Sequence, residues 1–139
     1  MNLHAAALAL VLLTAACAMT EREPPPRPFA ATRWDVVLEM PLAGEAPWFR
    51  FGDGRVDGFG GCNVVRAQYL QDSVGARAIA LRRIETGGKS CDPTAKAVEN
   101  RVLAVLQSVS SYTITGDTMR MSGSAGTIVL RAHPEEAKR

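Results

Sequence analysis

Hydrophobic and polar residues alternate along most of the chain after residue 32. Within residues 33–40 every second side chain is large and apolar, which is typical of a strand with one buried and one solvated side. Similar alternation, interrupted by turn residues, predicts further strands at residues 48–51, 55–59, 64–70, 78–84, 112–115, 118–122 and 127–132. Short turns such as Gly116-Asp117 join neighbouring strands as hairpins, so we expect an antiparallel sheet.

The periodicity changes once, after Asp92. Apolar residues then recur at steps of three and four, as on one face of a helix, at Ala95, Val98, Val102, Val105, Leu106 and Val109. Asp92 can accept hydrogen bonds from the first turn, and Pro93 has no N–H group to leave unpaired there. We therefore predict an α+β fold in which one helix, starting at Pro93, packs on the sheet. Glu99 lies away from the centre of the stripe, so we expect it on the helix surface.

A glycine-rich stretch, Gly58-Phe59-Gly60-Gly61-Cys62-Asn63, separates the third and fourth predicted strands. Glycines at this density indicate a bend, or a place where another group approaches the backbone closely. Cys91 stands directly before the predicted helix, and we expect it to form a disulfide with Cys62. Closing that loop would stabilise the domain by roughly 3–4 kcal/mol. The alternative is two free thiols buried in the core.

The first sixteen residues have the pattern of a secretory signal. The apolar run from Ala5 to Leu13 is too short to span a bilayer, which takes about 20 residues. Small residues precede Cys17, which resembles a bacterial lipobox, so we expect residues 1–16 to be a lipoprotein signal peptide and Cys17 to be lipidated. Lipidation also accounts for the odd number of cysteines. The alternative is a plain signal peptide followed by an unmodified cysteine.

Prolines and charged residues dominate the segment after Cys17. We interpret residues 17–31 as a lipid-anchored, Pro-rich tether, residues 32–132 as one domain and residues 133–139 as a flexible tail. A Pro-rich ligand for a partner is the alternative for the tether. Acyl chains on Cys17 would hold the domain on a membrane. The residue after Cys17 is Ala18 and not Asp. By resemblance to the sorting of proteobacterial lipoproteins, this favours the outer membrane, so we expect a bacterial envelope protein anchored in that membrane and facing the periplasm.

The charge balance and the residue types argue against several function classes. The chain has sixteen Lys and Arg residues and fourteen Asp and Glu residues, so its net charge is +2. It therefore lacks the basic excess of a nucleic-acid-binding protein. His133 is the only histidine beyond the signal, which leaves no basis for a catalytic triad or a zinc site. Residues 53–58 resemble a calcium loop only faintly, because Arg55 replaces an oxygen ligand. We expect no catalytic residues, no metal and no cofactor.

Several of these residues resemble the motifs of the META domain, the family of the heat-inducible HslJ lipoproteins of bacteria. The matching positions are Gly58, Gly61, Cys62, Asn63, Tyr69, Cys91 and Glu99. The resemblance covers residues 32–132. Two places depart from the family's usual residues: Ala67, and the loop before Cys91. It implies a curved antiparallel sheet, a β-roll or open barrel, with one packed helix. It implies no established chemistry.

These observations favour a non-catalytic envelope lipoprotein that binds or supports an envelope or secreted protein partner, with a role under stress. Two other hypotheses belong to different classes. The interior of a curved sheet could hold a small molecule or a lipid. A hydrolase with dispersed carboxylates, such as Asp57 and Glu99, is the weakest alternative, because no local motif supports it.

Overall fold

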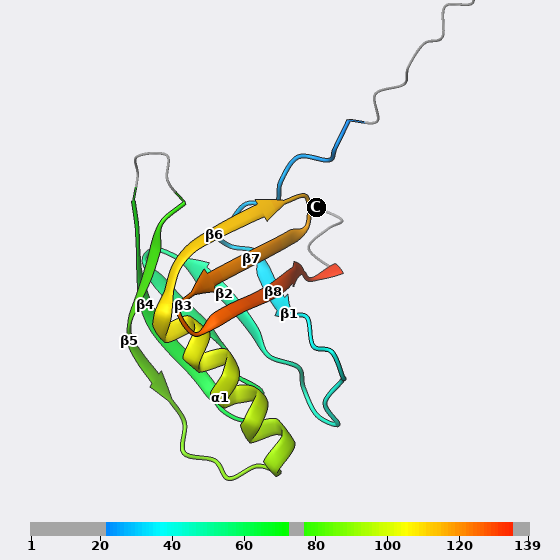
Figure 1. Ribbon diagram of the computed structural model, residues 1–139, viewed down its shortest axis with the longest axis vertical. Coiled ribbons are helices and arrows are strands. Elements are labelled where there is room, and N and C mark those ends of the chain that lie inside the picture. Colours follow the sequence, from blue (N-terminus) through cyan, green and yellow to red (C-terminus); the bar gives the residue numbers. More distant parts are fainter. Residues whose placement is uncertain (1–21, 73–76, 135–139) are drawn as a thin grey trace, which may run out of the picture.

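The structure is a computed structural model that describes residues 22–72 and 77–134 (Figure 1). The expected signal peptide, residues 1–16, and the expected lipidation site, Cys17, lie outside the described residues. So do residues 135–139 of the expected tail and most of the turn expected at residues 72–75. Within the described part of the chain, no helix combines the length and the hydropathy needed to cross a membrane.

Eight strands form one antiparallel sheet with the order β5-β4-β3-β2-β1-β8-β7-β6. A single helix, α1, occupies Pro93–Ser108. The strands are β1 (Arg33–Val36), β2 (Trp48–Gly52), β3 (Arg55–Phe59), β4 (Val64–Gln71), β5 (Ile79–Thr86), β6 (Val109–Thr115), β7 (Thr118–Gly123) and β8 (Gly126–Ala132). The α+β architecture predicted from the periodicity is confirmed.

The sheet curls so far that its two outer strands, β5 and β6, approach each other (Figure 1). A bridge between Ala78 and Ser111 joins them, and the N–H group of Tyr112 donates to the carbonyl of Arg77 at 3.0 Å. Farther along, the two strands separate, and α1 lies across the opening in contact with β5, β7 and β8. The fold is therefore the expected open barrel with one packed helix.

Packed side chains fill the inside of this barrel. Trp34, Phe49 and Phe51 of the sheet have no exposed surface, and neither has Leu106 of α1. They belong to one core, in which the apolar stripe of α1 packs against the sheet. Val109, expected at the end of that stripe, is buried but ends the helix and begins β6. The interior of the barrel is thus occupied by the protein's own core.

Strand β1 is shorter than the alternation over residues 33–40 predicted. It ends at Val36, whose N–H group donates to the carbonyl of Pro47 at 2.8 Å. Proline has no N–H group to return the bond, so the ladder between β1 and β2 stops there. The N–H group of Val37 still donates to the carbonyl of Val129 on β8 at 2.8 Å, and the chain then leaves the sheet. Met40, expected on the buried side, is 75% exposed.

Residues 27–31, expected to be the end of the tether, pack against the sheet. The ring of Phe29 lies 4.5 Å from that of Phe51 and 4.6 Å from that of Tyr112, measured between centroids. The indole N–H of Trp34 donates to the carbonyl of Phe29 at 3.1 Å. The packed part of the chain therefore begins before residue 32.

The other expected boundary, at His133, is also held by the sheet. The backbone N–H of His133 donates to the carbonyl of Arg33 at 2.9 Å. Its ring nitrogen Nδ1 lies 2.5 Å from Oδ2 of Asp35. His133 thus extends the pairing of β8 with β1.

Candidate functional site

The glycine-rich corner after β3 is shaped by close approaches. A Cβ atom on Gly58 would lie 2.3 Å from the carbonyl oxygen of Trp48, and one on Gly60 would lie 3.0 Å from Oε2 of Glu99. Gly61 has a φ of +114°, a conformation that side chains with a Cβ rarely adopt. The chain therefore turns here in a way that places its backbone against α1.

A buried carboxylate on α1 binds this corner. Oε2 of Glu99 accepts the backbone N–H groups of Cys62 at 3.1 Å and Asn63 at 2.5 Å. Oε1 accepts the side-chain amide of Asn63 at 3.0 Å and the ammonium group of Lys96 at 2.9 Å. The side chain of Glu99 has no exposed surface. Both carboxylate oxygens are thus hydrogen-bonded, as a buried charge requires.

The expectation that Glu99 lies on the helix surface is wrong. It follows Ala95 by four residues and precedes Val102 by three, so it belongs to the buried face of α1. A stripe defined by apolar residues alone does not include Glu99. Two signals in the sequence could have identified it as buried: its spacing from Ala95, and its membership, with Asn63, of the family motif.

The ionised form of Glu99 is the stable one. Burial alone would raise the pKa of Glu99. The hydrogen bonds that Lys96 and Asn63 donate outweigh this effect, and they hold the pKa below its ordinary value of 4.5. Glu99 therefore carries a negative charge at neutral pH, compensated by Lys96 and by backbone N–H groups.

Asn63 and the disulfide connect the corner to the loop before α1. Oδ1 of Asn63 accepts the backbone N–H of Lys89 at 2.7 Å. Cys62 and Cys91 form the expected disulfide, with 5.8 Å between their Cα atoms. Cys62 is buried whereas Cys91 is exposed. Corner, loop and helix are therefore joined by one covalent bond and several hydrogen bonds.

The structure brings most of the family-motif residues into this one cluster, which we name the corner cluster: Gly58, Gly61, Cys62, Asn63, Cys91 and Glu99. Tyr69 lies elsewhere. Its ring packs edge-on against Phe29 and Phe51, with centroids 5.5 and 5.8 Å away. Tyr69 therefore serves the aromatic end of the core.

The corner cluster is built for stability. In the part of the chain that the structure describes, no buried side-chain nitrogen or oxygen lacks a hydrogen-bond partner. The described residues also contain no group of three or more His, Cys, Asp or Glu side chains placed to hold a metal. Asp53 and Gly54, from the faint calcium motif, form the β2–β3 hairpin turn, with φ of 51° and 73°.

An apolar groove of about 600 Å³ lies between α1 and residues 37–42 and reaches β8, and its floor includes the core residues Val36, Val102 and Ile128. Val37 and Met40 line it with 49% and 75% of their surfaces exposed. Thr94 and Arg101 of α1 supply polar lining. The groove lies where the chain has left the sheet after Val37.

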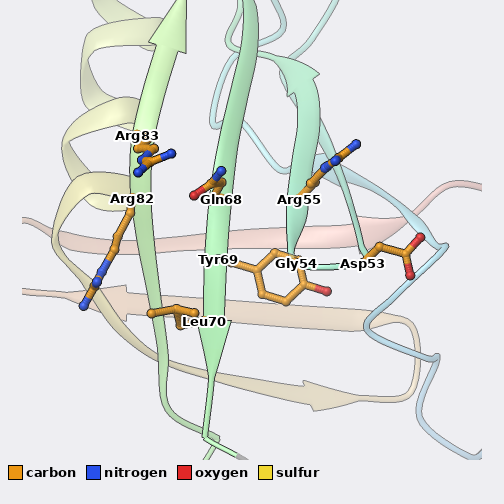
Figure 2. Close-up of a pocket in the computed structure, with 8 residues that line it drawn as sticks. All are labelled: Asp53, Gly54, Arg55, Gln68, Tyr69, Leu70, Arg82 and Arg83. Carbon is orange, nitrogen blue, oxygen red and sulfur yellow. The ribbon is translucent and has the colours of Figure 1, made fainter.

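A second cavity, of about 390 Å³, lies over β3, β4 and β5 (Figure 2). Its charged lining residues are Asp53, Arg55, Arg82 and Arg83, and Gln68 lies among them. The periodicity did not point to it, because alternation places consecutive residues such as Arg82 and Arg83 on opposite faces of a strand, whereas both are exposed here.

The disulfide gives the first prediction. In a Cys17→Ser background, which removes the third thiol, Cys91→Ala should lower the free energy of unfolding by about 3–4 kcal/mol, because the loop is no longer closed in the unfolded chain. Urea titration followed by circular dichroism measures it. A reducing agent should weaken the Cys17→Ser protein equally and leave the Cys91→Ala variant unchanged. A Cys17→Ser transition insensitive to reduction would contradict the prediction.

Glu99 gives the second prediction. Glu99→Gln should lower the free energy of unfolding at neutral pH by about 3 kcal/mol, because an amide N–H replaces an acceptor facing buried donors. The folded pKa of Glu99 lies below its unfolded value, so its contribution is present above 4.5 and is lost as pH falls through the folded pKa.

Denaturant titrations over a range of pH test this. The wild-type stability should fall more steeply below pH 4.5 than that of Glu99→Gln. Glu85→Gln, which changes an exposed carboxylate on β5, is the matched control and should stay within about 0.5 kcal/mol of wild type. Parallel pH curves for wild type and Glu99→Gln would rule out the assigned charge.

Comparisons with known proteins agree with this architecture. An NMR structure of a protein from Burkholderia xenovorans is similar, with a TM-score of 0.59 at 13% identity, covering 96% of this chain and 99% of that chain. A crystal structure of a DUF4847 family protein from Bacteroides vulgatus has a TM-score of 0.56 at 14% identity, covering 76% and 94%. At such identities the likeness concerns the fold alone.

No curated protein matches the chain significantly. The family model of the META domain matches residues 27–136, and the chain therefore belongs to the META domain family.

Proposed function

We propose that this protein is a lipoprotein of the bacterial envelope, anchored through Cys17, whose META domain binds an apolar segment of an envelope or secreted protein in the groove beside α1. The META family is not a known enzyme family, which supports a non-catalytic role. The groove is the observation that carries the proposal. An outer-membrane location facing the periplasm and a role under stress belong to the same proposal.

The groove has the properties of an interaction site. Large apolar side chains are exposed together there, and contiguous exposed apolar surface in a small protein commonly marks a binding site. Val37 and Met40 come from the segment that follows β1, whereas Val98 and Val102 come from α1. A partner's apolar side chains would thus be enclosed from two sides. Arg101 at the lining could pair with an acidic residue at the partner's rim.

A small molecule or lipid inside the barrel is less well supported. The interior side chains are packed against each other and against α1, so a ligand there would have to displace them. The groove beside α1 has a volume within the range of small-molecule sites, and a ligand there is the second candidate.

The anchor gives the third prediction. Cys17→Ser should abolish labelling by a palmitate analogue and move the protein from the membrane fraction to the soluble fraction of lysed cells, because the acyl chains supply the membrane affinity. Cys62→Ser is the control, and it should keep both label and membrane association. A Cys17→Ser protein that stays with the membrane would contradict anchoring through this residue.

The groove gives the fourth prediction. With Met40 replaced by benzoylphenylalanine in the full chain, irradiation of intact cells should produce one dominant adduct with an envelope or secreted protein. The same replacement at Val64, an exposed apolar residue of β4 that does not line the groove, is the control. Val37→Asp should reduce the Met40 adduct, because a charge enters the apolar contact.

Two results would overturn groove binding to a protein. One is an identical set of adducts from positions 40 and 64. The other is a Met40 adduct with lipid or a small molecule only, as identified by mass spectrometry, which would favour the second candidate.

A further inference from the structure

We propose that Arg55, Arg82, Arg83 and Gln68 form a binding site for a phosphate group, carried either by a lipid headgroup or by a soluble ligand. The first three lie on β3 and β5, and Gln68 lies on β4 between them. The register aligns Arg55 with Gln68 and Gln68 with Arg82 across adjacent strands, so the two arginines are about 10 Å apart. The cavity of about 390 Å³ lies over this row.

The positive charges of this row are not compensated. None of the three arginines forms an ion pair or side-chain hydrogen bond with another described residue. The neighbouring row on the same side of the sheet is different, because its charges alternate in sign at Arg50, Asp57, Arg66 and Glu85. In that row, Nε of Arg66 lies 3.8 Å from Oδ1 of Asp57. The uncompensated row is thus a local feature and not a general property of the sheet.

An irregularity of β5 adds the third arginine. From Arg66 to Gln68, β4 advances two residues while β5 advances three, from Glu85 to Arg82, so β5 contains a bulge. Arg83 lies in this bulge with a φ of +51°, where glycine is the favoured residue. Two consecutive residues, Arg82 and Arg83, are consequently both exposed. A side chain kept in a backbone conformation that disfavours it points to a use for that side chain.

The charge and the donors fit a phosphate group better than a carboxylate. With Asp53 included, the charged side chains that line the cavity sum to +2, which favours an anion. Guanidinium groups bind phosphate oxygens in pairs, and the Gln68 amide can supply a further N–H. Figure 2 shows Arg83 pointing toward Gln68, while Arg55 and Arg82 point away on either side. Both are exposed and can rotate inward on binding.

The test uses the full chain with Cys17→Ser, so that no acyl chain contributes to membrane binding. Inorganic pyrophosphate, titrated by calorimetry, probes the soluble source. Flotation with vesicles of phosphatidylglycerol and phosphatidylcholine, compared with phosphatidylcholine alone, probes the headgroup source. The variant Arg82→Gln with Arg83→Gly should bind either probe at least about tenfold more weakly, since it loses two charge-assisted contacts.

Folding is not at risk in this variant, because both side chains are exposed and glycine suits the backbone at position 83. Arg66→Gln, in the compensated row, is the matched control and should bind like the parent. Loss confined to the vesicles assigns a lipid headgroup, and loss confined to pyrophosphate assigns a soluble ligand. Absence of binding to both probes, or equal weakening by Arg66→Gln, would overturn the proposal.

Discussion

The ionised carboxylate of Glu99, enclosed without any exposed surface, is the constraint on which the rest of this structure depends. A buried charge costs several kcal/mol unless enough donors surround it. Here the donors come from Lys96 on the helix and from the corner after β3, in the backbone and side chain of Asn63. The charge is satisfied only when α1 has the right register and the corner has turned. An arrangement with the helix shifted would leave the carboxylate unpaired, so this one group selects a single way of closing the barrel.

The other corner residues follow from that requirement. Gly60 has no Cβ because one would crowd the carboxylate, and Gly61 takes a backbone conformation that places the next two N–H groups on it. Asn63 extends the network to the loop before α1 through Lys89, and the disulfide fixes the same loop covalently. These contributions are coupled, since each bond holds a segment that another bond also needs. The family-motif residues of the corner cluster thus serve the folding of this corner.

Much of the fold could be predicted because most of its signals are local. Alternation located the strands, Asp92 located the start of the helix, and Gly116-Asp117 located a hairpin. The side chain of Asp92 does accept N–H groups of the first turn. What failed depends on partners distant in sequence. The end of β1 is set by Pro47, which directly precedes the opposing strand β2. The position of Glu99 is set by donors of Asn63, which lies 36 residues away in the sequence. A hydrophobicity pattern assigns a charged residue to solvent, and it cannot show that the fold brings enough donors to bury it.

The same distinction separates the features that maintain the fold from those available for binding. The corner cluster is internally satisfied, because none of the buried side-chain nitrogens and oxygens of the described residues lacks a hydrogen-bond partner. The apolar groove and the arginine row share no lining residue, and both arise where the sheet is irregular: at the early end of β1 and at the bulge of β5. Met40 is exposed there, and Arg83 has a φ suited to glycine. A backbone conformation that disfavours its side chain is a reason to look for a function there, so we seek contacts with other molecules at these two places first.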